Sequence, residues 1–248
     1  MISWEYDGTF EGFLSLLYHS WSRRILPSMA APPWRIRRGV LGDWEHISTV
    51  PSKASLVWNY LRGKLSFQGR KRLYRAWLQD GEFTEILLLR YLSLVANRGR
   101  HMERDLLHPV VRQVEEAERG VLRETHRLQG LARFRKIREG YYAPLEPDFR
   151  VLPLLGDHFA ARYPDMPWIV HDLRREEALV FIPSQSWRMG PLKREAIPRN
   201  APEEESWQAL WREYYRVMGV EGRENPKLRR QFMPRRYWKH LVELDGEE

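Results

Sequence analysis

Cysteine is absent from this chain of 248 residues. Its absence excludes disulfide bonds, thiol nucleophiles, thiolate zinc sites and cysteine-ligated iron–sulfur clusters. Long apolar runs are absent too, because no stretch reaches the roughly 18 residues that a membrane-spanning helix needs. The first residues also lack the pattern of a secretory signal. We therefore expect a cytoplasmic protein that needs no cofactor and contacts no membrane.

Familiar catalytic motifs are missing as well. Gly8 and Gly12 are not followed by the Gly-Lys-Ser/Thr of a phosphate-binding loop. No dinucleotide-binding, serine-hydrolase or deaminase signature occurs. His101 and His108 are seven residues apart, but Pro109 interrupts the helix that would place them on one face. We therefore expect no metal site.

Positive charge is concentrated in one segment of the chain. Residues 21–75 carry twelve Lys and Arg against only Asp43 and Glu45, a net charge of +10 in a chain that totals +8. Tryptophan and tyrosine are interleaved with these bases, and a second basic cluster covers residues 223–239. Cations that neutralise phosphates, next to rings that stack on nucleobases, are typical of nucleic-acid-binding surfaces. The alternative is a solvated basic face with its tryptophans in the core.

The charge pattern thus predicts that DNA is a partner. The predicted contacts are the stacking candidate Trp34 and the basic residues Arg35, Arg37, Arg38, Arg70, Lys71, Arg72, Arg75, Arg235 and Arg236.

Apolar periodicity predicts mainly helices, with a few strands. The expected helices begin after Thr9, cover 82–97, run from Pro109 to Gly130, open at Asp148, cover 207–218, and follow Pro226 and Pro234. The expected strands cover 131–138, 141–146, 168–172 and 178–182, while 28–52 and 183–202 are expected to be irregular.

This order of elements predicts an α+β fold. It comprises a small antiparallel sheet of the form strand-strand-helix-strand-strand, with helical N- and C-terminal parts. We expect residues 1–248 to form a single integrated domain, with boundaries near 100 or 200 as the alternative.

His126 and Arg133 are the strongest paired candidates for a site. His126 lies near the end of the long helix, and Arg133 follows Gly130, whose missing side chain permits close backbone approach. Such a junction could bind a phosphate or a flipped base. Alternatively, His126 interacts with the last carbonyls of its own helix, and Arg133 is buried and paired with Asp172 or Glu146.

Asp172 completes the candidate catalytic set. It follows His171 on a predicted strand, so the two side chains point to opposite faces and cannot form a dyad. Asp172 is either an acid or base with a raised pKa or the ion-pair partner of Arg174 or Arg175, and the ion pair is the commoner arrangement. The tryptophan-rich stripe of 207–218 is interpreted as helix packing.

Several blocks carry a family resemblance. They are 6–13 (YDGTFEGF), 126–135 (HRLQGLARFR) within a pattern that runs to Phe181, 225–228 (NPKL) and 233–238 (MPRRYW). In these blocks the chain resembles a bacterial family of unknown biochemical activity that is described as acting in DNA metabolism or DNA repair. Ala132 stands where a larger apolar residue is usual in that family.

The resemblance implies a cellular process, DNA repair or modification, rather than a particular chemical reaction. Members of that family occur near, or fused to, a domain resembling the uracil-DNA glycosylase superfamily, and they are associated with a radical S-adenosylmethionine protein assigned to DNA modification or repair. Without cysteine this chain cannot be the radical enzyme itself, and it carries no recognisable glycosylase motif. The family has no established catalytic residues to carry over.

Three functions follow as expectations. The first is a DNA-binding accessory or processing protein in a bacterial repair or modification system, acting with a separate radical or glycosylase partner. The second is a DNA-processing enzyme, a lyase or hydrolase, that uses His126, Arg133 and Asp172. The third is an adaptor that binds protein through its aromatic surface.

Overall fold

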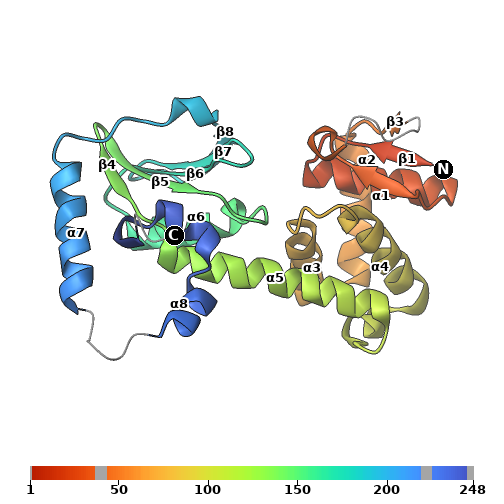
Figure 1. Cartoon of the computed structure of the whole chain (residues 1–248). Helices are drawn as coiled ribbons and strands as arrows, with labels where there is room; N and C mark the ends of the chain where they lie inside the picture. The colour runs from red at the N-terminus through yellow and green to blue at the C-terminus, as the bar shows by residue number, and fades with distance from the viewer. Residues whose placement is uncertain (1, 37–43, 219–224, 245–248) are drawn as a thin grey trace. The chain divides into compact units, whose positions relative to one another are not determined.

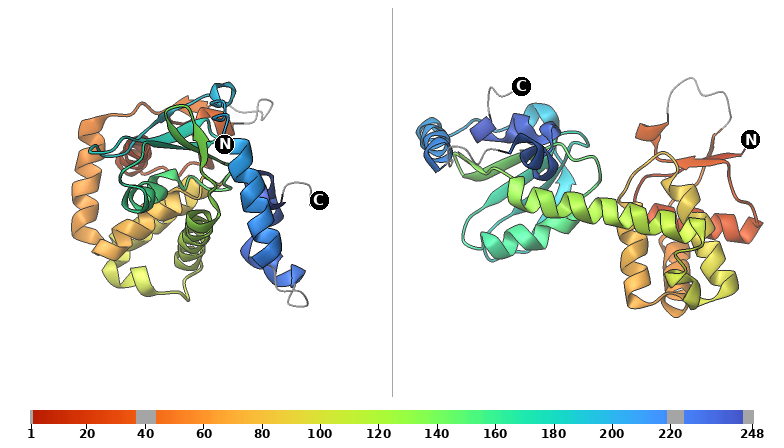
Figure 2. Two further views of the ribbon diagram at one scale, coloured as in Figure 1. Left: turned by 90° about the vertical axis from the view of Figure 1, so that its left-hand side faces the viewer. Right: turned by 60° about the horizontal axis from the view of Figure 1, so that its bottom comes forward.

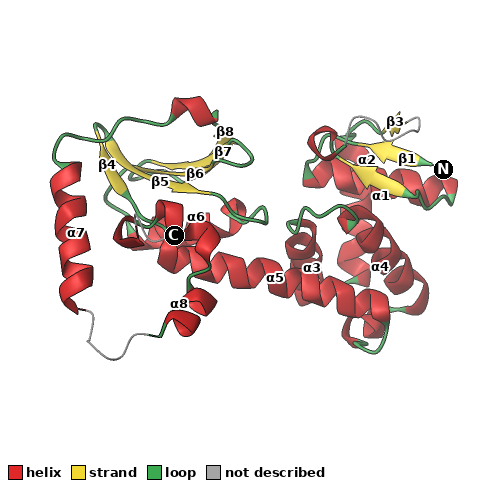
Figure 3. Cartoon of the chain, in the orientation of Figure 1, coloured by secondary structure: helices red, strands yellow, loops and turns green. Residues whose placement is uncertain are grey.

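The computed structural model describes residues 2–36, 44–218 and 225–244. The chain forms two compact units, Met1–Leu122 (unit 1) and Arg123–Glu248 (unit 2). Helices predominate, and each unit contains a small sheet (Figure 3). These elements confirm the α+β class. A single integrated domain over all 248 residues stays a prediction.

Unit 1 places short strands against a group of helices (Figure 1). Its described strands form a sheet of order β2-β1-β3 in which both pairs are parallel. The elements are β1 (Ser3–Glu5), α1 (Phe10–Arg23), β2 (Met29–Ala31), η1 (Pro33–Arg35), β3 (Trp44–His46), α2 (Pro51–Lys64), α3 (Phe67–Trp77), α4 (Thr84–Arg98) and η2 (Arg100–Arg104).

Helix boundaries in unit 1 follow local capping chemistry. The Thr9 hydroxyl accepts a hydrogen bond from the Gly12 N–H at 2.9 Å, which confirms the predicted start of α1. Helix α4 ends at Gly99, whose φ of +97° suits a residue without a side chain. Helix α5 (Pro109–Leu131) begins after His108, whose Nδ1 accepts from the Val110 N–H at 3.3 Å. The first part of α5 belongs to unit 1 and its last turns belong to unit 2.

Unit 2 is built on a mixed sheet whose described strands have the order β4-β5-β6-β7-β8. Helix α6 packs against the sheet at β7, and α7 lies along its β4 edge (Figures 1 and 2). The elements are β4 (Arg135–Ile137), β5 (Gly140–Leu145), α6 (Leu152–Arg162), β6 (Trp168–Asp172), β7 (Glu177–Phe181), β8 (Arg188–Pro191), η3 (Arg194–Ala196), α7 (Glu204–Met218), α8 (Pro226–Phe232), η4 (Arg235–His240) and η5 (Val242–Leu244).

Aromatic side chains fill the space between α6 and the sheet. Phe159 and Trp168 meet edge to face with their ring centroids 6.1 Å apart, and Trp168 stacks on Phe181 at 5.1 Å. Tyr142 is fully buried on the opposite face of the sheet, where its hydroxyl lies 2.8 Å from His171 Nδ1. The ring contacts of Phe159 and Trp168 hold α6 at a fixed position on the sheet, so the residues that α6 presents on its other side are also fixed.

The sheet differs from its prediction in two ways. It is mixed, because α6 connects β5 to β6 and a helical crossover returns the chain in the parallel direction. It also has an additional edge strand, since β8 lies within the segment expected to be a loop and pairs with β7. Similarly, 28–52 is not irregular throughout but contains β2, β3 and the start of α2.

Two helix boundaries also differ from prediction. Helix α5 runs one residue beyond Gly130, and strand β4 begins only at Arg135, so Arg133 lies in a connection rather than in a strand. Helix α6 begins at Leu152 instead of opening at Asp148, whose backbone N–H donates to the Glu124 carboxylate at 3.0 Å.

Candidate functional site

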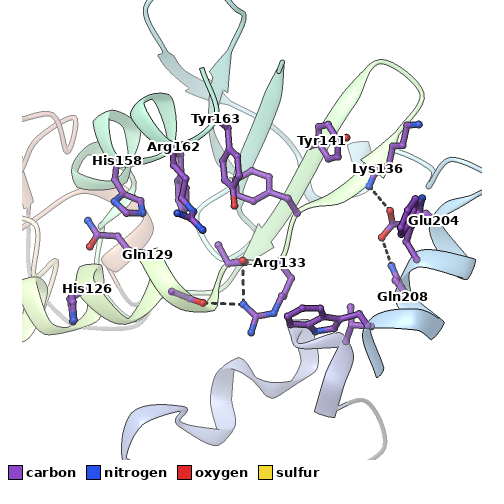
Figure 4. A pocket seen from close by; sticks show the side chains of 17 residues that line it. His126, Gln129, Arg133, Lys136, Tyr141, His158, Arg162, Tyr163, Glu204 and Gln208 are labelled. Carbon is purple, nitrogen blue, oxygen red and sulfur yellow. Dashed lines mark hydrogen bonds between the residues drawn. The ribbon is translucent and has the colours of Figure 1, made fainter. Parts of the chain in front are cut away.

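A pocket of about 890 Å³ lies within unit 2 (Figure 4). Its walls come from the end of α5, the connection to β4, strands β4 and β5, helices α6 and α7, and η5. Basic and aromatic side chains dominate the lining. The basic ones are His126, Arg133, Lys136, His158 and Arg162, and the aromatic ones are Phe134, Tyr141, Phe159, Tyr163, Trp207 and Trp211.

One wall of the pocket is basic. His126 projects from α5, and His158 and Arg162 project from α6 one helical turn apart, which puts them on the same face. Among the residues that the structure describes, these three side chains have no acidic partner within ion-pair distance. The Arg162 guanidinium on this wall therefore carries a positive charge that is available to an anion, and the two imidazoles beside it can donate hydrogen bonds to one.

Glu204 is the acidic residue in the described lining, and its carboxylate is already engaged. It accepts hydrogen bonds from the backbone N–H of Lys136 at 2.7 Å and from the Gln208 side chain at 2.9 Å (Figure 4). The Lys136 ammonium instead pairs with Glu203 at 2.7 Å. Glu204 thus fixes α7 to β4 and is hydrogen-bonded to protein rather than presented as a free base.

Arg133 lines the pocket, but Glu243 holds its guanidinium. Its Nε lies 3.1 Å from a Glu243 oxygen, its Nη2 also contacts that carboxylate, and its Nη1 donates to the Gly130 carbonyl at 3.0 Å. The Trp211 indole N–H donates to the same carboxylate at 3.0 Å. Burial is the largest influence on the pKa of Glu243 and raises it, but the hydrogen bonds and charge of Arg133, with the Trp211 hydrogen bond and a backbone hydrogen bond, together outweigh burial and lower the pKa.

The expected partner of Arg133 was therefore wrong. The prediction named Asp172 or Glu146, and the structure shows Glu243, which lies 110 residues further along the chain. This pair connects the end of α5 to η5, and Trp211 adds α7 to the same junction. Arg133 therefore both lines the pocket and holds together the elements that form its walls.

Asp172 is not brought to the pocket. It is buried at the end of β6, where Arg175 Nη1 lies 3.0 Å from Oδ2 and the backbone N–H of Arg174 donates to Oδ1 at 2.9 Å. Burial raises the pKa of Asp172, and the Arg175 guanidinium opposes that rise. The ion-pair interpretation is confirmed, and the grouping of Asp172 with His126 and Arg133 is wrong.

His171 has a structural environment as well. It is fully buried, with Nδ1 2.8 Å from the Tyr142 hydroxyl and Nε2 2.8 Å from the Leu192 carbonyl. A carbonyl only accepts, so Nε2 carries the proton and the Tyr142 hydroxyl donates to Nδ1. Burial lowers the pKa of His171.

In unit 1, ion pairs occupy several bases that were predicted to contact DNA. Arg35 is partly buried, with a side chain that is 14% exposed, Nε 3.2 Å from Asp80 and further contacts to Glu85 and the Gly81 carbonyl. Burial raises the pKa of Glu85, and Arg35 opposes that rise. Arg35 therefore stabilises unit 1 and offers little surface to a phosphate.

Arg72 and Arg75 share one acidic partner. Their guanidinium groups lie 3.0 and 2.9 Å from the two Glu118 oxygens. Arg70 donates to the Leu65 carbonyl at 3.0 Å, while Lys71 is exposed above the Phe67 ring. DNA contact by this helix stays a prediction, with Lys71 its most accessible base.

The remaining residues that were predicted to contact DNA differ in how accessible they are. Trp34 is 58% exposed. Arg37 and Arg38 lie outside the described residues. Arg236 pairs with Asp148 at 3.2 Å, and Arg235 lies over the Trp238 ring, so both are engaged in holding the C-terminal segment of unit 2.

The sequence interpretation missed the contribution of α6. It read this segment for its apolar residues and did not consider His158 and Arg162, whose spacing of four already puts two cationic side chains on one face of a helix. Tyr141 and Lys136 were read only as strand residues. The missing information was tertiary, since α6 and α5 meet only when the sheet forms.

Comparison with known proteins identifies the family of this chain but no biochemical activity. A family defined as a domain of unknown function, DUF4130, matches residues 82–243, about two thirds of the chain, and the chain belongs to this family. No curated protein and no solved structure matches it. Every residue that lines the pocket falls inside the matched region.

The described residues contain neither a membrane-spanning helix nor a metal-binding cluster. No helix there is both long enough and apolar enough to span a bilayer. No group of three or more His, Asp and Glu in the described ranges has an arrangement that could hold a metal ion.

Proposed function

We propose that this protein binds DNA and that the unit 2 pocket receives a nucleotide of the bound strand. The observation that carries the proposal is the division of the lining into basic and aromatic parts. His126, His158 and Arg162 suit a phosphate, because the Arg162 charge is not neutralised by described acidic residues and both imidazoles can donate hydrogen bonds. Phe134 and Tyr163 offer ring faces and edges to a base.

The cellular role that we propose is that of an accessory or processing protein in a bacterial DNA repair or modification system. Its partner would be a separate radical S-adenosylmethionine protein or a uracil-DNA glycosylase-like protein. The resemblance of the blocks at 6–13, 126–135 and 225–238 supports this setting. The absence of cysteine supports a division of labour, because any radical chemistry must reside in the partner.

A second candidate function is catalysis on the bound strand, as a lyase or hydrolase. It is favoured by two histidines, His126 and His158, that line the same pocket beside Arg162. Imidazole exchanges protons near neutral pH, and a neighbouring guanidinium stabilises phosphate charge. The catalytic set proposed from the sequence changes accordingly, with His158 taking the place of Asp172.

The test is DNA binding by an Arg162→Ala variant over a series of salt concentrations. We expect weaker binding and a log–log salt dependence that is shallower by about 0.7–0.9, the value for one lost phosphate contact. Arg188→Ala is the matched control, because Arg188 is an exposed arginine of unit 2 that does not line the pocket. Equal effects of the two substitutions would overturn the assignment of the pocket.

A further inference from the structure

Helix α7 presents a large aromatic face to solvent. Trp207 is 60% exposed and Tyr214 is 52% exposed, and Trp211 lies between them at 40%. The expectation that this stripe packs in the core was wrong. The helix instead docks through Tyr215, which packs against a small cluster of Trp238, Leu241 and Leu244 in the C-terminal segment. Exposed rings on this scale mark a binding surface.

The aromatic face is continuous with the pocket. Trp207 and Trp211 line the pocket and also belong to the exposed stripe, one helical turn apart. Tyr214 extends the stripe, with its ring stacked on Trp211 at a centroid distance of 5.6 Å. A ligand that extends from the pocket along α7 therefore contacts three successive rings. They span about 10 Å, because Trp207 and Tyr214 are seven residues apart and a helix rises 1.5 Å per residue.

The position of the rings on the helix separates them from the aliphatic residues. At 100° per residue, Trp207, Trp211 and Tyr214 fall within about 60° of one another, on the side nearer Tyr215. Leu210 and Val217 are exposed too, but they lie further round the helix, away from the packed side. Met218 is 61% exposed at the far end of the same stripe, so the purely aromatic part of the face is the part beside the pocket, at Trp207 and Trp211.

The charges near this face suit a polyanion. Arg162 and His158 border the same pocket, whereas the exposed Arg212 lies about 100° round the helix from Trp211 and is not part of the face. Glu213 pairs with Arg216 at 2.6 Å, and Glu204 is hydrogen-bonded to β4, so these two carboxylates of α7 are compensated. Rings beside cations form the combination that binds single strands, since each base has a face to stack and each phosphate needs a counter-charge.

We propose that the aromatic face of α7, formed by Trp207, Trp211 and Tyr214, stacks the bases of a single-stranded stretch of DNA that leads to the pocket. This inference rests on the proposed function and names its substrate class. Paired bases are stacked inside a duplex and cannot lie on side-chain rings, so the face selects unpaired bases over paired ones.

The experiment measures the affinity of a labelled single strand and of its duplex by fluorescence anisotropy. Trp207→Ala with Tyr214→Ala should weaken single-strand binding by about 5- to 150-fold per stacked base and leave duplex binding unchanged. Trp207→Phe with Tyr214→Phe keeps both rings and should retain most of the affinity. Leu210→Ala with Val217→Ala is the matched control, because it removes exposed apolar surface from the same helix without removing a ring.

Four results would overturn the inference. One is an equal loss in the aliphatic control, which would indicate a general apolar surface. Another is that the aromatic substitutions abolish self-association or binding of a partner protein but leave the affinity for single-stranded DNA unchanged. The face would then be a protein-docking site. The third is DNA binding that Arg162→Ala weakens and the α7 substitutions do not. In that case the proposed function would survive, whereas a wild-type protein that binds no DNA would refute both.

Discussion

Replacement of Arg133 tests the junction that forms the pocket. Arg133→Ala leaves the Glu243 carboxylate, whose side chain is 1% exposed, without its cation. An orphaned buried charge costs about 3–5 kcal/mol. Arg133 is itself 25% exposed and Trp211 still donates to the carboxylate, so we expect a loss of stability at or somewhat below the lower end of this range. A loss of roughly 2–3 kcal/mol corresponds to a fall in Tm of about 4–12 °C in a chain of this size.

The assay is thermal unfolding followed by circular dichroism, with two companion variants. Arg133→Lys should lie between wild type and Arg133→Ala, since lysine keeps the charge and loses the planar fork. Adding Glu243→Gln to Arg133→Ala should recover at least half of the lost stability, because it removes the orphaned charge while keeping an acceptor for the Trp211 N–H. An Arg133→Ala protein as stable as wild type, or an absence of rescue by Glu243→Gln, would refute the reasoning. A stable Arg133→Ala protein that no longer binds DNA would make Arg133 a ligand-contacting residue.

Two further predictions concern stability. Burial lowers the pKa of His171, so its folded-state pKa lies below the unfolded value of about 6.5. The contribution of the neutral His171 to the free energy of unfolding is therefore fully present above pH 6.5, and it is lost as the pH falls through the folded-state pKa. The Tm should therefore fall between pH 7.5 and pH 5.5, less steeply in His171→Asn, and parallel curves would contradict this origin. In unit 1, Arg72→Ala with Arg75→Ala orphans Glu118 and should lower the Tm, whereas Lys71→Ala should not; urea unfolding curves that coincide for the two variants would contradict the structural role.

The long elements could be predicted because their signals are local. The apolar spacing of α4 and α5, the Thr9 cap of α1 and the pairing of β6 with β7 around a short turn all reside in adjacent residues. The strands β1, β2 and β3 are three residues each, too short for an alternating pattern to identify their partners. The parallel pairing of β5 with β6 depends on how α6 packs, which no local pattern records.

The site was predictable only in part for the same physical reason. His126 and Arg133 were found because they lie in one recognisable block. Glu243 and Arg162 were missed because their proximity to that block is created by tertiary packing. The exposure of α7 was also unpredictable, since an amphipathic helix shows the same pattern whether its apolar face meets a core or a ligand.

Photo-crosslinking tests the central claim, that the unit 2 pocket and the adjoining aromatic face bind DNA. A single-stranded oligonucleotide carrying 5-iodouracil is irradiated with the protein, and the attached peptide is identified by mass spectrometry. The account predicts crosslinks to pocket and α7 rings, such as Tyr163, Trp207 or Tyr214. Crosslinks confined to the basic segment 21–75 of unit 1 would contradict it.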